Sequence, residues 1–332
     1  MQLNHISIPT SVRESAQFVY EHSQRVSIND NVLKDLVVLI EKRLAAGIDT
    51  VETAFGTTNS LEKDCNIVFF ETACNFYFWA QDDTERWKID YDGEMTGGWY
   101  GLAAAFKRAL ASGRPMYDAR YMANLTMNEA SEVFIGTHNI QIPLLERRVG
   151  NIIEAARFLN EKHDGSCYEF LRSCNFSAPR IAKAITHELA SYRDGAWYKD
   201  TWIWILKRAQ ILPSDLAQLS ANYPDFQITD LDDLTIFADY RLPQVLRHYG
   251  ALTYSDELAA RIDNRQIIPS GSPEEIEIRA ATLIACNRLQ ALRPDMKLSN
   301  IDLGLWLLSQ DNREEGDIAD MKPHHLTPGY FY

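Results

Sequence analysis

The sequence predicts a mainly α-helical protein that forms one compact unit, with a small antiparallel β insertion at about residues 65–92. Apolar residues recur every three or four positions over most of the chain, which is the period of a helix with one buried face. Helix-start patterns punctuate these stretches: Ser or Thr stands three residues before Glu at 11–14, 126–129 and 272–275. No linker rich in Pro, Gly or Ser divides the 332 residues, so we expect a single domain over 1–332.

The expected elements follow from local patterns along the chain. Apolar stripes predict helices after residue 11 and over 31–46, 102–110, 144–159, 181–189, 203–219 and 300–308. The pattern Ser-Pro-Glu-Glu at 272–275 predicts a helix that runs to about residue 292, and Ser255 is expected to start another. The strands of the β insertion are expected in the apolar or alternating segments 67–70, 75–79 and 87–91. The acidic stretch 311–320 is expected to be a solvated loop.

Composition limits the class of function. The net charge is -13 and no run of basic residues is present, which argues against DNA or intact tRNA as the main ligand. No stretch reaches the ~20 apolar residues that a membrane helix needs, and the first residues do not form a secretory signal. The five cysteines are odd in number and include no CxxC pair, which favours reduced thiols in a cytoplasmic protein.

The stretch 234–250, LTIFADYRLPQVLRHYG, carries the strongest candidate for chemistry. An apolar run leads to Asp239, Pro243 is expected to open a helix, and Gly250 stands where a helix C-cap is wanted. A carboxylate at such a break is either the N-cap of the following helix or a working acid or nucleophile. The spacing leaves both interpretations open.

Other candidates are equally ambiguous when taken alone. Lys207 and Arg208 are neighbours on an expected helix and point about 100° apart, so we expect Lys207 inward and Arg208 in solvent, with the reverse open. Asp302 either binds a ligand or caps its own helix, and the two glycines at 97–98 either bind an anion or form a tight turn. The adjacent pair His324–His325 is weak evidence for a metal site because no further ligands stand at suitable spacing.

Several long motifs resemble the queuosine salvage protein family. They are FADYRLPQVL (237–246), KRAQIL (207–212), GSPEEIEIRA (271–280), NFYFW (75–79), TGGWYGLAAAFKRAL (96–110), SYRD (191–194) and the terminal HHLTPGYFY. The family hydrolyses the N-glycosidic bond of queuosine 5'-monophosphate and releases the base queuine. The resemblance also implies a core similar to that of the helical DNA glycosylases. The sequence contains no GxGxxG, P-loop or GxSxG motif, so we expect a hydrolase that needs neither metal nor cofactor.

The resemblance assigns roles to particular residues. Asp239 matches the catalytic aspartate of the family. Phe237 and Asp302 match positions that contact the base, and Lys207 is the expected phosphate ligand. Further expected substrate-binding residues are Trp306, Arg241, Tyr240, Asn75 and Phe78.

The match is not complete. Leu303 and Leu307 stand where the family can show a tyrosine and a second aspartate, and no matching histidine is evident between 48 and 59, so part of the base recognition is expected to differ. Two other functions stay open: a non-catalytic protein that retains queuine or a nucleotide, and a glycosylase acting on bases in DNA or RNA.

Overall fold

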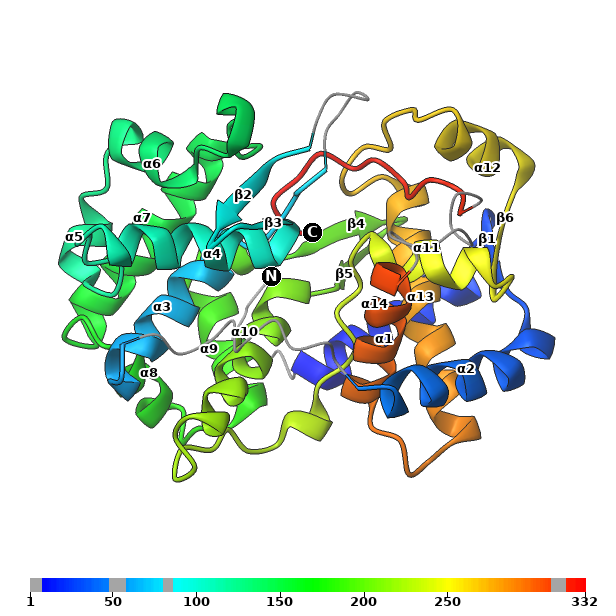
Figure 1. Cartoon of the computed structure of the whole chain (residues 1–332). Helices are drawn as coiled ribbons and strands as arrows, with labels where there is room; N and C mark the ends of the chain where they lie inside the picture. The colour runs from blue at the N-terminus through cyan, green and yellow to red at the C-terminus, as the bar shows by residue number, and fades with distance from the viewer. Residues whose placement is uncertain (1–7, 48–57, 80–85, 312–320) are drawn as a thin grey trace.

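The computed structural model describes residues 8–47, 58–79, 86–311 and 321–332 (Figure 1). Within these ranges the chain forms fourteen α-helices and three antiparallel sheets of two strands each. The expected mainly α-helical class is therefore confirmed.

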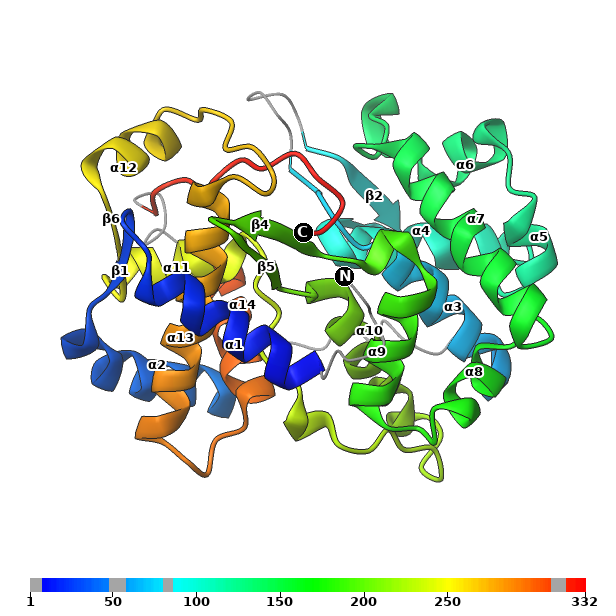
Figure 2. The same cartoon turned by 180° about the vertical axis from the view of Figure 1, so that it is seen from behind.

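The first group of helices joins the two ends of the chain (Figure 1, blue and yellow to red). Its long central helix α13 has buried residues on all its sides, and α1, α2, α11 and α14 pack against it. Figure 2 shows α1 lying across α13. The members of the group are α1 (Ile8–Glu21), α2 (Leu33–Ala45), α11 (Arg241–His248), α12 (Asp256–Asp263), α13 (Pro273–Leu292) and α14 (Leu298–Asp311), with strands β1 (Val26–Ile28) and β6 (Leu252–Tyr254).

The second group comes from the middle of the chain (Figure 1, cyan to green). It consists of α3 (Leu61–Ala73), α4 (Gly98–Ala111), α5 (Ala119–Ala123), α6 (Met127–Phe134), α7 (Leu145–Lys162), α8 (Cys167–Ser173), α9 (Ala178–Glu188) and α10 (Lys207–Ala217), with the hairpin β2 (Lys88–Tyr91) and β3 (Glu94–Gly97). A second hairpin, β4 (Gly195–Tyr198) and β5 (Thr201–Trp204), lies between the groups (Figures 1 and 2). Short 3-10 turns occur at Asp30–Val32, Thr137–Asn139, Ala190–Tyr192, Gln218–Ala221 and Leu231–Asp233.

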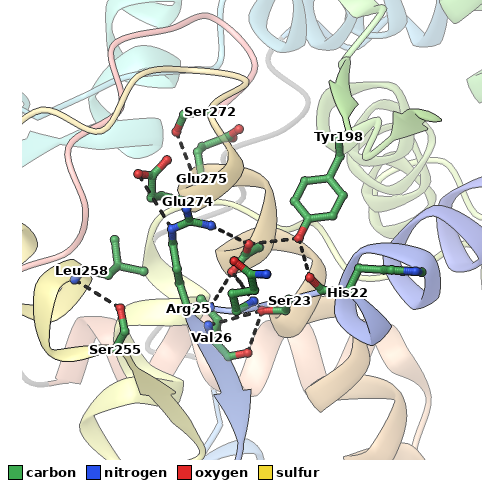
Figure 3. Close-up of polar contacts among 12 residues, drawn as sticks. His22, Ser23, Arg25, Val26, Tyr198, Ser255, Leu258, Ser272, Glu274 and Glu275 are labelled. Carbon is green, nitrogen blue, oxygen red and sulfur yellow. Dashed lines mark hydrogen bonds and ion pairs between the residues drawn. The ribbon is translucent and has the colours of Figure 1, made fainter. Parts of the chain in front are cut away.

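A buried carboxylate ties the β4–β5 hairpin to the first group. Glu277 of α13 accepts hydrogen bonds from the backbone N–H groups of Gln24 and Arg25 and from the hydroxyl of Tyr198. Figure 3 shows Tyr198 pointing toward His22 and the turn that follows it. Because a buried carboxylate is costly without donors, this set of bonds holds the α1–β1 turn, α13 and β4 together.

The expected β insertion is mostly wrong, since residues 67–70 lie inside α3 and 75–79 form no strand. Every residue of α3 from Asp64 to Ala73 is buried, so the segment has no polar face and its apolar run lacks helical periodicity. Only 88–91 form a strand, as expected from their alternation. The helix expected over 203–219 begins at Lys207, because residues 201–204 pair as β5.

Helix caps were predicted more reliably, except that Ser11 lies inside α1 and does not start it. Thr126 and Glu129 form the full capping box of α6, and the hydroxyl of Ser272 accepts from the N–H of Glu275 at the start of α13. Ser255 caps α12. The acidic stretch 312–320 and most of 48–59 lie outside the described residues. No helix of the described part of the chain has the length and apolarity required to cross a bilayer.

Candidate active site

A cavity of about 390 Å³ lies where the two helical groups meet, a volume typical of sites for small molecules. All nine residues that the sequence analysis named line it: Asn75, Phe78, Lys207, Phe237, Asp239, Tyr240, Arg241, Asp302 and Trp306. They come from the end of α3, the start of α10, the segment before α11, and α14. Packing of the two groups therefore brings together residues that lie far apart in the sequence.

Asp239 stands two residues before α11, and its side chain caps the first turn of this helix. Its Oδ1 accepts hydrogen bonds from the backbone N–H groups of Arg241 (2.7 Å) and Leu242 (3.0 Å). Its Oδ2 accepts no hydrogen bond from the described residues. The two interpretations of this carboxylate are thus compatible, because one oxygen orients the group and the other is left for a ligand. Pro243 is the third residue of the helix and not its first, and Gly250 has the expected positive φ of 74°.

Asp302 is held against the segment that carries Asp239. Its Oδ2 accepts the backbone N–H of Phe237 at 2.7 Å. It is the fifth residue of α14, so the alternative that it caps this helix is wrong. Burial raises the pKa of Asp302 to about 8, and the negative charge of Asp239 acts in the same direction, while the Phe237 hydrogen bond opposes them. Asp302 is therefore mostly protonated at neutral pH and offers one O–H donor to the cavity.

Lys207 is the first residue of α10 and is only 6% exposed. Its ammonium group forms no hydrogen bond or ion pair with the described residues. Burial lowers the pKa of Lys207, and the carboxylate of Asp239 nearby partly restores it. A buried ammonium without a partner is costly, so this side chain is suited to an anionic ligand.

Asp215 is a cavity residue that sequence reasoning missed. It lies eight positions after Lys207 on the same face of α10, and burial raises the pKa of its carboxyl to about 7 while Lys207 lowers it. The helical spacing from Lys207 was the pattern that could have found it. Other missed lining residues include Ser214 of α10, Gln218 of the 3-10 turn after it, Ser299, Asn300 and Gln310 of α14, and Tyr332.

Aromatic rings form much of the wall. The Trp306 ring centroid lies 5.7 Å from that of Tyr100, and Tyr240 lies 4.6 Å from His324. Phe78 stacks on Trp87 with centroids 6.3 Å apart. Flat apolar walls of this kind suit a planar heterocycle.

The remaining two predicted residues occupy the edges of the cavity. Asn75 is buried directly after α3. Arg241 donates from Nη1 to Gln244 at 2.9 Å, and its Nε is buried without a hydrogen-bond partner in the described structure. The turn at Gly97–Gly98 also borders the cavity, and Gly98 has a φ of 62°, so the tight-turn interpretation holds for this pair.

The expectation that Arg208 is solvated is wrong. Lys207 does point into the cavity, but Arg208 is 1% exposed and donates to the backbone carbonyl oxygens of Ala73 and Ser191. Its guanidinium donates a hydrogen bond to the carbonyl group of Ala73 at the C-terminal end of α3, which has no partner within the helix. Both neighbours are buried because helix α10 is covered on two sides, by α3 and by α9.

The two adjacent histidines have structural partners. His324 Nδ1 lies 2.8 Å from the carbonyl oxygen of His325, and His325 Nε2 lies 3.0 Å from the hydroxyl of Tyr332. The described residues contain no group of three or more His, Cys, Asp or Glu side chains that could hold a metal ion.

Comparison with known proteins places the chain. The model of the queuosine salvage protein family matches residues 55–332. The chain belongs to the queuosine salvage protein family. A relative from Sphaerobacter thermophilus is 34% identical over 323 residues, with 95% of each chain covered. A relative from Mus musculus is 30% identical over 340 residues, covering 98% of this chain and 99% of its own. Both are named queuosine 5'-phosphate N-glycosylase/hydrolase.

Membership of this family gives the cavity its context. The motif that contains Asp239 falls within the matched range, as do Lys207, Asp302 and the aromatic walls. The relatives cover nearly the whole length of the chain, so both helical groups belong to the shared unit.

Proposed function

We propose that the protein hydrolyses the N-glycosidic bond of queuosine 5'-monophosphate and releases queuine for salvage into tRNA modification. The observation that carries this proposal is that Oδ2 of Asp239, which accepts no hydrogen bond from the residues the structure describes, lies in an aromatic-walled cavity of a queuosine salvage family member. The names of the full-length relatives support the same substrate.

Asp239 is proposed as the catalytic group. As the bond between C1' and the base breaks, positive charge develops on the ribose, and a carboxylate beneath C1' stabilises it or adds to it covalently. The two N–H bonds to Oδ1 hold the carboxylate in a fixed orientation. The oxygen of a water molecule then bonds to C1', and the proton that this water loses replaces the one taken up by the base.

Asp302 is proposed to donate a proton or a hydrogen bond to the departing base. The base leaves with the electron pair of the broken bond, so its negative charge needs a proton or a hydrogen-bond donor. A carboxyl group that stays protonated at neutral pH can supply one. Phe237, Trp306, Tyr240 and Phe78 are proposed to hold the flat base, together with Asn75.

Lys207 is proposed to bind the 5'-phosphate, with Arg241 as a second cation at the cavity edge. A dianionic phosphate offsets the cost of the buried ammonium and forms charge-assisted hydrogen bonds. Binding energy gained at the phosphate also holds C1' over Asp239, so it contributes to kcat as well as to KM.

Steady-state rates with queuosine 5'-monophosphate and with queuosine test the proposal, with queuine release followed by chromatography. We expect the nucleotide to be cleaved far faster than the nucleoside. Binding of the nucleotide without turnover would favour the non-catalytic binding protein, and equal rates on both compounds would refute phosphate recognition.

The third possibility, a glycosylase acting on DNA or RNA, is disfavoured by the net charge of -13. We propose no stable nucleic-acid partner, and a salt-dependent gel shift with tRNA would contradict this. We also propose one domain over 1–332 in the cytoplasm; a continuous apolar core and five free, buried cysteines support these two points.

A further inference from the structure

A buried ion pair lies beside the cavity and contacts the backbone of Lys207 and of Ala238, the residue before Asp239. Arg279 of α13 is 2% exposed and Asp194, which precedes β4, is 3% exposed. The guanidinium donates to both carboxylate oxygens, from Nη1 at 2.9 Å and from Nη2 at 2.6 Å. Such a two-point contact fixes orientation as well as distance.

The arginine side of the pair supports the segment that carries Asp239. Arg279 Nε donates to the carbonyl oxygen of Ala238 at 3.0 Å. Ala238 is completely buried and directly precedes Asp239. The position of the peptide that leads into Asp239 is therefore set by this guanidinium.

The aspartate side of the pair supports Lys207. Asp194 Oδ2 accepts the backbone N–H of Lys207 at 3.0 Å, and its carbonyl oxygen accepts the N–H groups of Ile205 and Leu206. Leu206 stands at the N-cap of α10 with a φ of 56° and cannot cap the helix with its own side chain. The Asp194 carboxylate caps α10 in its place, which holds Lys207 at the helix start.

We infer that Asp194 and Arg279 are positioning residues that set the distance between Asp239 and Lys207. This inference rests on the proposed function, in which Asp239 stabilises C1' and Lys207 holds the 5'-phosphate. Asp239 and Lys207 are on different segments, and no hydrogen bond joins them among the described contacts. Their common attachment to one rigid ion pair explains how phosphate binding places C1' correctly over the carboxylate.

The third contact of the pair extends the same support to another cavity residue. Arg279 Nη1 also lies 3.2 Å from Oε1 of Glu275, which accepts the hydroxyl of Tyr332 at 2.6 Å. Tyr332 lines the cavity, and its ring lies 4.7 Å from the guanidinium. The buried side chain of Arg279 thus contacts Ala238, Asp194 and Glu275, three residues that support the cavity wall.

The test uses the conservative variants Arg279→Lys and Asp194→Asn in the full chain. Lysine keeps the charge but cannot hold both the carboxylate and the Ala238 carbonyl. Asparagine keeps an acceptor for the Lys207 N–H but loses the charge. Since a misplacement of about 1 Å can cost roughly 100-fold in rate, we expect kcat on the nucleotide to fall about 10- to 100-fold, with KM changed less than about threefold. The rate on the nucleoside should fall much less, so the preference for the nucleotide shrinks.

The matched control is Glu277→Gln, which removes the charge of another fully buried carboxylate on the same helix. Glu277 supports the α1–β1 turn and Tyr198 and does not line the cavity. We expect this variant to lower the unfolding temperature while the folded protein keeps its substrate preference. All proteins are assayed well below their unfolding midpoints, with Asp194→Glu as a further variant if Asp194→Asn does not fold.

A second measurement combines each variant with Lys207→Ala. If the ion pair acts through the distance between the two groups, Arg279→Lys should slow the Lys207→Ala protein by less than about threefold. If the wild type prefers the nucleotide but the variants lose the same factor in rate on both substrates, the inference is overturned and the proposed function stands. A wild type without any preference would overturn both.

Discussion

At the scale of single residues, the cavity contains carboxyl groups in contrasting surroundings. Asp239 accepts two backbone N–H groups on one oxygen. Asp302 is half-buried and accepts one backbone N–H group, and desolvation raises its pKa to about 8. A carboxyl group whose pKa is raised in this way is typical of a general acid in an enzyme.

Asp239→Asn tests the charge of the first carboxylate. An amide oxygen can still accept the N–H groups of Arg241 and Leu242, so we expect an unchanged unfolding temperature. The rate should fall at least ~100-fold, the scale of losing one key electrostatic group. Asp118→Asn is the control, because Asp118 caps α5 with the same geometry away from the cavity. Near-normal turnover in Asp239→Asn would leave this residue with its capping role alone.

Asp302→Asn tests the raised pKa through stability. Between the ordinary pKa near 4 and the folded value of about 8, the folded protein keeps a proton that the unfolded chain has lost. Stability therefore declines as pH rises through this window. We expect the unfolding free energy of the wild type to drop by about 1–3 kcal/mol more than that of Asp302→Asn between pH 5 and pH 8. Urea titrations at both pH values measure it, and identical drops would contradict the assignment.

At the scale of elements, α10 and α4 deliver groups to the cavity from their first residues. Lys207 opens α10, and Gly97–Gly98 open α4. In each case a backbone with positive φ, at Leu206 or at Gly98, turns the chain sharply into the helix. At Leu206 this conformation costs local backbone strain, whereas Gly98 adopts it freely because glycine has no Cβ.

Lys207→Ala should remove the advantage of the phosphorylated substrate. The loss of charge-assisted hydrogen bonds is worth about 1.5–3 kcal/mol, so kcat/KM on the nucleotide should fall roughly 10- to 100-fold. The value for the nucleoside should change less than about threefold. Lys34→Ala on the exposed face of α2 is the control. An equal fall on both substrates would show that Lys207 does not act through the phosphate.

Alanine substitutions at two glycines test how the backbone conformation at each position affects stability. Gly150 lies inside α7 with open space around an added methyl group, so Gly150→Ala should stabilise the protein by about 0.5–1 kcal/mol. Gly98 has equal space but a φ of 62°, so Gly98→Ala should destabilise it by about 1–2 kcal/mol. Thermal unfolding of both variants gives the comparison, and a stabilising Gly98→Ala would mean that the turn tolerates a side chain.

At the scale of the whole molecule, the cavity is formed by two groups that pair the ends of the chain with its middle (Figure 1). Neither group forms the site alone, because Asp239 and Asp302 come from one and Lys207 and Phe78 from the other. In the proposed function the substrate binds across the contact between the two groups, so we expect binding to stabilise their association.

Chelation tests the expected metal-free mechanism on the whole enzyme. The described residues offer no cluster of ligands for a metal, and both neighbouring histidine rings have hydrogen-bond partners. We expect prolonged EDTA treatment followed by gel filtration to leave turnover unchanged. Zinc bound in equal amount to the protein and lost together with activity would contradict this.

The sequence alone predicted what depends on neighbours in the chain. Helix caps at Thr126 and Ser272 and the closing turn at Gly250 follow from local hydrogen bonding and φ preferences, and all are present. Long family motifs also pointed to Asp239 and the other cavity residues, because a resemblance over whole segments carries tertiary information that periodicity does not.

Only the tertiary structure decided what depends on packing between distant segments. Helix α3 has no polar face because it is enclosed, so its apolar run was mistaken for strands. Arg208 is buried because carbonyl groups of α3 and of Ser191 accept its hydrogen bonds. The Asp194–Arg279 pair joins residues 85 positions apart. Such contacts arise from the burial of whole helices against one another, and local spacing does not record which helix will lie opposite.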